Sequence, residues 1–222
     1  MKREIITTAD GSTTIQLPEW NEQYHSKHGA IIEAKHVFIE SGLNHWVGQH
    51  PNTPISILEI GFGTGLNAFL NLIEASNKNL TVTYTGIEAY PIQSSEIKQL
   101  NYAEMLKASK EDFMRLHEVE WERSSKIHSN FKLIKRKMFF SEIDDKLTQD
   151  LIYFDAFGPR VQPELWTEEV FKKMFLVLKP KGILVTYSAK GSVRRAMQTV
   201  GFTVERLSGP PGKREMLRGT KD

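Results

Sequence analysis

Three glycines and a glutamate stand at the end of a short apolar segment, in Glu59-Ile60-Gly61-Phe62-Gly63-Thr64-Gly65-Leu66-Asn67. Glycines after an apolar run let the backbone turn tightly and approach a ligand closely. The helix expected to follow would present its N-terminus to bound polar or anionic groups. The sequence therefore predicts a ligand-binding loop at Gly61–Gly65.

The spacing of these glycines distinguishes between cofactors. A dinucleotide fingerprint needs glycine at the sixth position, where Leu66 stands, and no Gly-Lys-Ser/Thr follows as a phosphate-binding loop would need. The spacing resembles the first motif of class I S-adenosylmethionine-dependent methyltransferases. We expect S-adenosyl-L-methionine to bind here, at Glu59, Gly61, Gly63, Gly65 and Asn67. The alternative is an ordinary strand–helix turn.

Two further carboxylates follow apolar segments. Glu88 ends Thr85-Gly86-Ile87-Glu88 and could accept hydrogen bonds from both hydroxyls of an adenosyl ribose. Asp155 follows Leu151–Phe154, and ligands of open parallel sheets bind beyond the carboxyl ends of the strands. We therefore expect both carboxylates at one edge of the sheet. The alternatives are a surface glutamate at a strand end and an aspartate that caps the next turn.

Asp155 is our candidate for the chemical step. Methyl transfer to an amine needs an unprotonated nitrogen held in line with the sulfonium methyl group. Asp155 could accept a proton or a hydrogen bond from that amine. Phe157 could pack against a base or against the methyl group. We therefore expect Asp155 and Phe157 to form the catalytic part of the site.

The composition excludes several other chemistries. The chain has no cysteine, which rules out disulfides, thiolate metal sites and cysteine nucleophiles. Its histidines show no metal-binding spacing, and no Gly-x-Ser-x-Gly indicates a serine hydrolase. No apolar run approaches the roughly 18–20 residues of a membrane span, and no signal peptide is visible. We expect a cytoplasmic protein without metal or membrane contact.

The elements that would position these residues alternate between strands and helices. The expected strands are 55–60, 82–88, 131–134, 151–155, 183–188, 202–207 and 215–218, and the expected helices are 65–75, 91–109, 111–127, 168–178 and 192–200. This order predicts an α/β, Rossmann-like fold with a seven-stranded, mostly parallel sheet and helices on both faces.

The first fifty residues should form an extension on this core. Asp10-Gly11 lies between β-branched runs and predicts a hairpin over Glu4–Leu17. A helix over Glu33–Trp46 should break at Gly42. We therefore divide the chain into residues 1–50, the hairpin and helix, and residues 51–222, the cofactor-binding core, within one structural domain.

The charge is uneven along the chain. Residues 160–222 contain thirteen Lys/Arg and six Asp/Glu, a net +7 in a chain whose total is +2. This basic third could attract a polyanion such as RNA, or it could be an ordinary solvated surface. Its pairs Arg194-Arg195 and Lys213-Arg214 are candidate phosphate contacts, with the same alternative.

Several longer segments resemble one family, the methyltransferase domain of MnmC and its stand-alone relatives. Tyr24-His25-Ser26 with His36-Val37-Phe38 is similar to the family's lead-in segment, and Glu59–Asn67 matches its glycine loop without a gap. Asp155-x-Phe157-x-Pro159, followed by Pro163-Glu164-Leu165-Trp166-Thr167, is similar to its Asp-x-Phe-x-Pro signature, and Gly212–Leu217 completes the series. The resemblance covers about residues 24–219.

The resemblance implies an activity: methylation of the aminomethyl nitrogen of 5-aminomethyl-2-thiouridine at the wobble position of tRNA. A wobble base in the single-stranded anticodon loop can be splayed out and stacked on an aromatic such as Phe157 or Trp166, and Tyr24 would close over the cofactor. Nothing resembles the flavin-dependent oxidase half of MnmC. We therefore expect a separate oxidase or upstream modification enzyme to supply the amine.

The sequence departs from the family pattern at two places. Lys135-Arg136-Lys137 stands where the family usually has Gly-Asp, and Arg160-Val161-Gln162 replaces the usual Ala-Lys-Asn. Two alternatives therefore stay open: methylation of another amine, and a catalytically inactive relative that binds cofactor or RNA.

Overall fold

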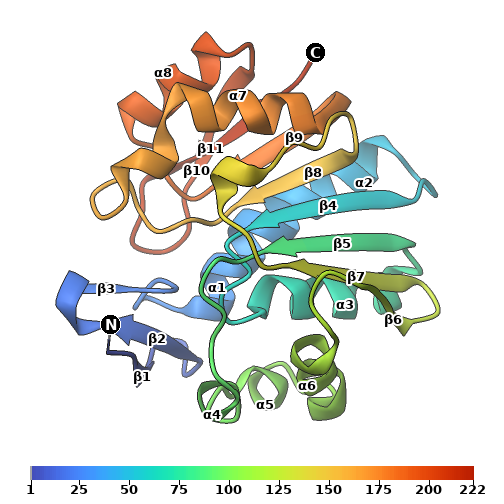
Figure 1. Ribbon diagram of the computed structural model, residues 1–222, viewed down its shortest axis with the longest axis vertical. Coiled ribbons are helices and arrows are strands. Elements are labelled where there is room, and N and C mark those ends of the chain that lie inside the picture. The colour runs from blue at the N-terminus through green and yellow to red at the C-terminus, as the bar shows by residue number, and fades with distance from the viewer. Residues whose placement is uncertain (1) are drawn as a thin grey trace.

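An open sheet of eight strands forms the centre of the computed structural model, which describes residues 2–222 (Figure 1). The strand order is β10-β11-β9-β8-β4-β5-β7-β6. The five central strands from β9 to β7 are parallel, and β6, β10 and β11 are antiparallel to their neighbours. The strands are β4 (Ile55–Ile60), β5 (Val82–Ile87), β6 (Ser124–His128), β7 (Phe131–Arg136), β8 (Gln149–Phe154), β9 (Leu178–Thr186), β10 (Thr203–Ser208) and β11 (Glu215–Thr220).

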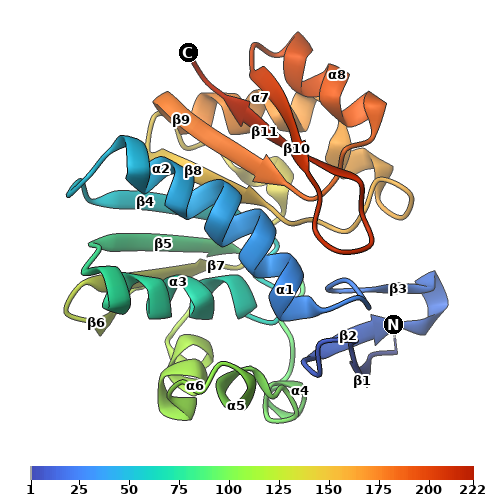
Figure 2. The same ribbon diagram turned by 180° about the vertical axis from the view of Figure 1, so that it is seen from behind.

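Helices cover both faces of the sheet. On one face lie α7 (Glu168–Val177) and α8 (Gly191–Thr199); on the other, seen from behind in Figure 2, lie α3 (Leu66–Lys78) and a long helix made of α1 (Ala30–Ala34), the π-helical segment Lys35–Asn44 and α2 (His45–Gln49). Beyond β5 follow α4 (Ser94–Ile97), α5 (Tyr102–Met105) and α6 (Lys110–Glu118). None of the helices within residues 2–222 is both long and apolar enough to cross a bilayer.

The apolar runs of the central strands create two cores. Alternate side chains of a strand point to opposite faces. In β8, Leu151 and Tyr153 enter the core shared with α3, whereas Ile152 and Phe154 enter the core shared with α7 and α8. All four side chains are fully buried. A strand covered on both faces in this way reads as a continuous apolar run, and β8 shows such a run from Leu151 to Phe154.

The predicted class I methyltransferase fold, with its mostly parallel sheet, is confirmed, but the strand count of seven is wrong. The eighth strand is β6, at Ser124–His128, where we expected a helix to continue to residue 127. This strand lies at the edge of the sheet and only Ile127 is buried, so it carries no apolar run to indicate a strand. Its pairing with β7 determined its structure instead.

The break expected at Gly42 is also wrong, because the helix runs on from Ala30 to Gln49. Gly42 instead allows close packing. A side chain there would begin 3.0 Å from the Tyr153 ring and 3.1 Å from Val185. The glycine therefore lets the helix approach the sheet.

The predicted hairpin is present and carries a third strand. Strands β1 (Glu4–Thr7), β2 (Thr13–Leu17) and β3 (Glu22–Gln23) form the N-terminal sheet, which lies beyond the carboxyl ends of β4 and β5 (Figure 1). Asn101 anchors it: the Asn101 carboxamide accepts from the Thr13 N–H at 2.8 Å and donates to the Gly11 carbonyl at 2.9 Å. These bonds help to explain why the helix expected over residues 91–109 is two short ones, α4 and α5. The division of the chain at residue 50 stays a prediction.

Candidate active site

The glycine loop lies close against two other segments of the chain. Gly61, Gly63 and Gly65 have φ angles of 93°, 50° and 72°, in the region that favours glycine. A side chain at Gly61 would begin 2.8 Å from the Asp155 carbonyl oxygen, and one at Gly63 would begin 3.1 Å from the Tyr24 ring. The loop is therefore closely covered by the residue after β8 and by the N-terminal segment.

Glu88 holds the loop from the end of β5. One of its carboxylate oxygens accepts from the Gly63 N–H at 3.0 Å, and the other accepts from the Tyr90 N–H at 2.9 Å. A carboxylate has about four lone-pair sites, so each oxygen can accept a further hydrogen bond. Glu88 can therefore hold the loop and bind a ligand hydroxyl at the same time.

Asn67 joins the other two carboxyl groups. Its amide nitrogen donates to Glu59 and to Asp155, each at 2.9 Å. Burial raises the pKa of Asp155 well above its usual value, and the charge of Glu33 adds to this effect. Burial also raises the pKa of Glu59, with a further contribution from Asp155. A carboxylate with a raised pKa is a stronger base than an ordinary aspartate, which suits Asp155 for accepting a proton.

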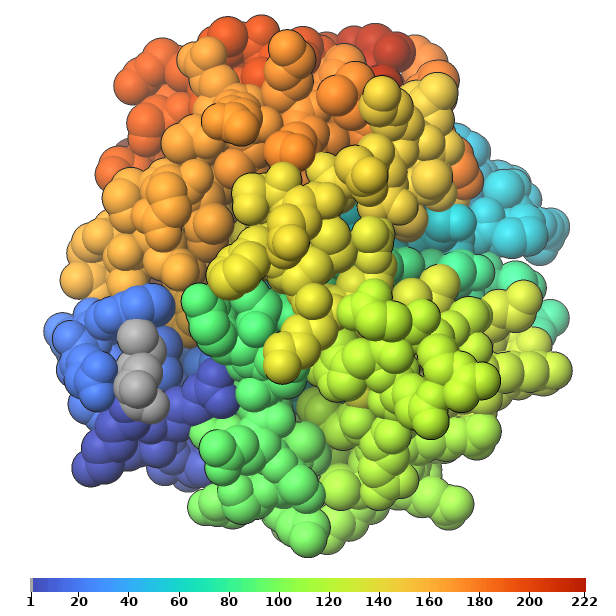
Figure 3. Space-filling model, viewed as in Figure 1, coloured from blue at the N-terminus to red at the C-terminus, as the bar shows by residue number. Residues whose placement is uncertain are grey.

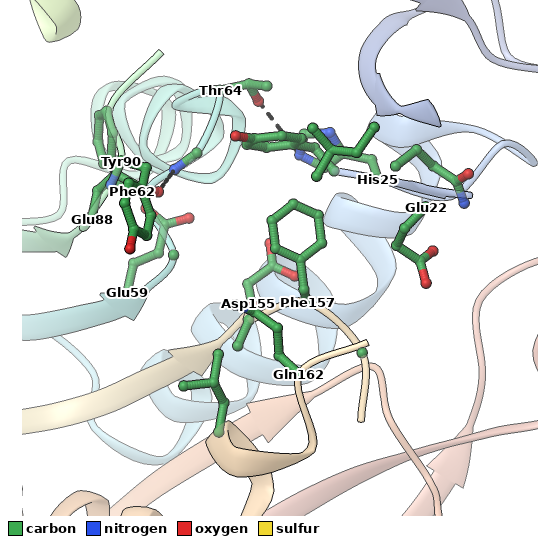
Figure 4. Close-up of a pocket in the computed structure, with 18 of the residues that line it drawn as sticks. Glu22, His25, Glu59, Phe62, Thr64, Glu88, Tyr90, Asp155, Phe157 and Gln162 are labelled. Carbon is green, nitrogen blue, oxygen red and sulfur yellow. Dashed lines mark hydrogen bonds between the residues drawn. The ribbon is translucent and has the colours of Figure 1, made fainter. Parts of the chain in front are cut away.

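These groups line one large cavity of about 1510 Å³ (Figure 4). Pockets for a single small molecule usually measure about 300–1,000 Å³, so the cavity has room for two. In the view of Figure 4, Phe157 lies between Glu88 on one side and Glu22 on the other. The predicted residues in the lining are Tyr24, Glu59, Gly61, Gly63, Asn67, Glu88, Asp155, Phe157 and Lys213.

The remaining predicted residues lie outside this cavity. Gly65 is the N-cap residue of α3. Arg194 and Arg195 belong to α8, and Arg214 lines a separate shallow depression together with Lys190. These cations therefore lie on the surface beside the site rather than within it.

The expectation that a base stacks on Trp166 is corrected. Trp166 is only 5% exposed and packs against Phe154, Phe171 and Tyr187. Its indole nitrogen donates to the Phe157 carbonyl at 2.8 Å. The tryptophan therefore supports the loop that carries Phe157 and offers no face to a ligand.

The structure also changes our interpretation of Lys213 as a phosphate contact. Its ammonium group pairs with the buried Glu33 at 2.5 Å and lies 3.9 Å from the centroid of the Tyr187 ring. Glu33 also accepts from the Ser26 N–H at 2.8 Å. This pair ties the loop between β10 and β11 to α1 and sets the charge near Asp155.

The lysine that departs from the family pattern turns away from the cavity. Lys135 is 1% exposed, donates to the His117 carbonyl at 2.5 Å and lies over the Trp121 ring. Burial lowers its pKa to about 8. Arg136, the next residue, pairs with Asp145 at 2.6 Å. The departure therefore adds no cation to the cavity lining.

Sequence reasoning missed several residues of the lining. Tyr90 and Phe139 are exposed on the rim and pack edge to face, with their ring centroids 5.9 Å apart. Trp20, Glu22 and Glu33 reach the cavity from the N-terminal segment. Tyr90 could have been found from its place two residues after Glu88, whereas the sequence carries no signal for the others.

A buried histidine connects the N-terminal sheet to the glycine loop. One ring nitrogen of His25 lies 3.0 Å from the Thr14 hydroxyl in β2, and the other lies 3.5 Å from the Thr64 hydroxyl (Figure 4). Tyr102 donates to the same Thr64 hydroxyl at 3.2 Å. Burial lowers the pKa of His25 to about 4.

This lowered pKa predicts an acid-sensitive fold. The unfolded chain binds a proton at His25 near pH 6.5, whereas the folded protein does so only near pH 4. The contribution to stability is therefore complete above pH 6.5 and falls as the pH drops toward 4, by about 2 kcal/mol at pH 5. We expect His25→Gln to flatten the pH dependence of the melting temperature between pH 7 and 5.

The control is His28→Gln, since His28 is exposed. His117, whose pKa burial lowers to about 3, keeps its contribution in both variants. If the melting temperatures of the wild type and of His25→Gln changed equally between pH 7 and 5, His25 would not be the source of the acid sensitivity.

The sheet, the glycine loop and the carboxylates beyond its parallel strands define a class I S-adenosylmethionine-dependent methyltransferase fold. A family model described as "S-adenosyl-L-methionine-dependent methyltransferase" matches residues 100–222. The chain belongs to this family and is a relative of the MnmC methyltransferase domain.

The individual similarities are as follows. The "tRNA 5-methylaminomethyl-2-thiouridine biosynthesis bifunctional protein MnmC" of Leptospira borgpetersenii is 29% identical over 210 residues, which cover 90% of this chain and 32% of that protein. The chain thus spans about a third of the length of these curated relatives. The crystal structure of MnmC2 from Aquifex aeolicus matches with a TM-score of 0.77 and 27% identity, covering 98% of this chain and 70% of that one. Spermidine synthase from Thermotoga maritima, at 16% identity and a TM-score of 0.58, covering 99% and 68%, shares the fold.

Proposed function

We propose that the chain transfers a methyl group from S-adenosyl-L-methionine to the aminomethyl nitrogen of 5-aminomethyl-2-thiouridine at the tRNA wobble position, in the cytoplasm. The observation that carries this proposal is the position of Asp155. Asp155 lies in a cavity with room for two ligands and on the same rim of the sheet as Glu88. The acceptor is inferred from the MnmC relatives, which are named for tRNA 5-methylaminomethyl-2-thiouridine biosynthesis.

The residues present fit the cofactor. The backbone of Gly61 and Gly63 is exposed to the cavity, and Glu88 has free acceptor capacity for the ribose hydroxyls. Tyr90 and Phe139, which pack edge to face, offer an aromatic surface for the adenine ring. Asn67 keeps one buried oxygen for which residues 2–222 offer no hydrogen-bond partner. When bound, S-adenosyl-L-methionine would supply an electrophilic methyl group on a sulfonium.

The charge of the cavity suits a cationic cofactor and an amine acceptor. Its lining contains eight carboxyl groups and four basic side chains, Arg3, Lys27, Lys173 and Lys213, so it attracts positive ligands. Asp155 would take the proton from the acceptor ammonium and hold the free amine in position. The amine nitrogen would then form the new bond to the methyl carbon as the carbon–sulfur bond breaks.

The basic surface beside the cavity would meet the RNA backbone. Lys190, Arg194, Arg195 and Arg214 come from α8 and the two loops near its start. Phosphates of the anticodon stem-loop could contact these cations while the wobble nucleotide enters the cavity. An upstream reaction, performed by an oxidase or another modification enzyme, must supply the primary amine.

The test uses the purified protein, S-adenosyl-L-methionine with a labelled methyl group, and tRNA that carries 5-aminomethyl-2-thiouridine. We expect label in the tRNA and the methylaminomethyl nucleoside by mass spectrometry. The same tRNA with an unmodified wobble uridine is the control and should stay unlabelled. Cofactor binding without transfer would favour another amine acceptor, and no binding of the cofactor would favour an inactive relative.

A further inference from the structure

An aromatic wall runs along one side of the cavity and is formed by Tyr24, Phe157 and Trp20. The ring centroids of Tyr24 and Phe157 are 5.0 Å apart, and those of Trp20 and Phe157 are 5.7 Å apart, both nearly perpendicular. Tyr24 contacts the glycine loop at Gly63. Phe157 is therefore the middle of the wall, and Trp20 extends it from Phe157 within the same cavity.

Arg160 fastens the end of this wall. One of its guanidinium nitrogens lies 3.0 Å from the Glu22 carboxylate, 3.2 Å from the Asn21 carbonyl and 3.5 Å from the Trp20 carbonyl. Asn21 has a φ of 48°, so the chain reverses sharply between Trp20 and Glu22. Arg160 thus joins the loop after β8 to the turn that carries Trp20. It is also the first residue of the segment that departs from the family pattern.

The chemistry of the wall favours a planar ligand. Trp20 is partly exposed and lines the cavity. Aromatic side chains next to a nucleotide pocket stack on unpaired bases, whatever their sequence. A short aliphatic amine would leave the ring face of Trp20 without a partner. An amine carried on a base would cover it.

We propose that Trp20 selects an acceptor in which the amine is carried by a heteroaromatic ring, by stacking on that ring, and that Arg160 is the positioning residue that holds Trp20 in place. The inference deepens the proposed function and rests on it for the identity of the amine. It adds a residue from the N-terminal segment to the acceptor site, for which the sequence indicated Phe157 and Trp166.

The kinetic test compares Trp20→Ala, Trp20→Phe and Arg160→Ala with the wild type. Base stacking on one aromatic is worth roughly a tenfold to hundredfold change in binding. We expect Trp20→Ala to raise the KM for the aminomethyl tRNA by about that factor, with the Kd for the cofactor unchanged and kcat much less affected. Trp20→Phe should bring the KM most of the way back to the wild-type value. Arg160→Ala should raise KM by about fivefold and have no effect in the Trp20→Ala background. Arg123→Ala, which removes an exposed ion pair with Glu120, is the control.

A binding test separates this inference from the proposed function. Anticodon stem-loop RNA with uridine at the wobble position is compared with the same RNA that is abasic there, with S-adenosylhomocysteine present so that no transfer occurs. We expect the wild type to prefer the base-bearing RNA and Trp20→Ala to lose that preference. This result would support the role of Trp20 even if no methyl transfer were found. A wild type without any preference, or a Trp20→Ala variant with the wild-type KM and preference, would overturn the inference, even if transfer is normal.

Discussion

Replacing Asp155 with asparagine is expected to lower kcat for methyl transfer by a factor of about 10²–10⁴, the usual contribution of a positioned base. The variant keeps an oxygen for the hydrogen bond from Asn67 but has no group that can take a proton. Cofactor binding, measured by calorimetry, should change little. The rate of the wild type should fall at low pH, beginning above the pKa range of an ordinary aspartate, because burial raises the pKa of Asp155.

Two checks make this prediction specific. The melting temperature of Asp155→Asn should not fall, because a raised pKa means that the folded protein holds the ionised carboxyl at a cost, which asparagine avoids. Asp144→Asn, at an exposed aspartate outside the cavity lining, is the matched control. A variant at Asp155 that methylates at the wild-type rate would remove Asp155 from the chemical step.

Replacing Glu88 with alanine is expected to weaken cofactor binding by at least about a hundredfold. Hydrogen bonds to a charged group contribute about 1.5–3 kcal/mol each, and two ribose hydroxyls would lose their acceptor. The Gly63 N–H would also lose its partner, which loosens the glycine loop. Calorimetric titration of the protein with S-adenosyl-L-methionine measures the change directly.

Glu88→Gln separates the contributions of charge and shape. The amide keeps one acceptor oxygen, so we expect the affinity for the cofactor to fall by about tenfold. Glu104→Gln, at an exposed glutamate of α5, should bind the cofactor as the wild type does. If Glu88→Ala retained the wild-type Kd, the ribose would have to be bound elsewhere.

Much of the fold could be predicted because buried parallel strands have a simple sequence pattern. The runs that became β4, β5 and β8 are largely apolar since both of their faces are covered. Two features depend on tertiary contacts and have no local pattern. The edge strand β6 is polar and gains its structure from pairing with β7, and Gly42 is a packing contact within a continuous helix.

The candidate site could be predicted where it follows the strands. Glu88 and Asp155 come directly after β5 and β8, so the rule for the carboxyl ends of parallel strands placed them correctly. Trp20 and Glu33 come from the N-terminal segment, whose path over the sheet no local pattern specifies. Trp166 was misplaced because an aromatic next to a site signature can support a loop as readily as it can face a ligand.

The N-terminal segment has a consequence for how the cavity opens. In Figure 3 the blue N-terminal residues pack against the green segment after β5, where Arg3 bonds the Tyr90 carbonyl at 2.8 Å. Two further borders are the ion pairs Glu22–Arg160 and Glu33–Lys213, which join residues far apart in sequence. Contacts of this kind break in local opening motions, which cost less free energy than global unfolding. Amide hydrogen exchange should therefore be faster in β1–β3 than in β4, β5 and β8. Ligand entry would then need only the breaking of these border contacts, while the central sheet stays intact.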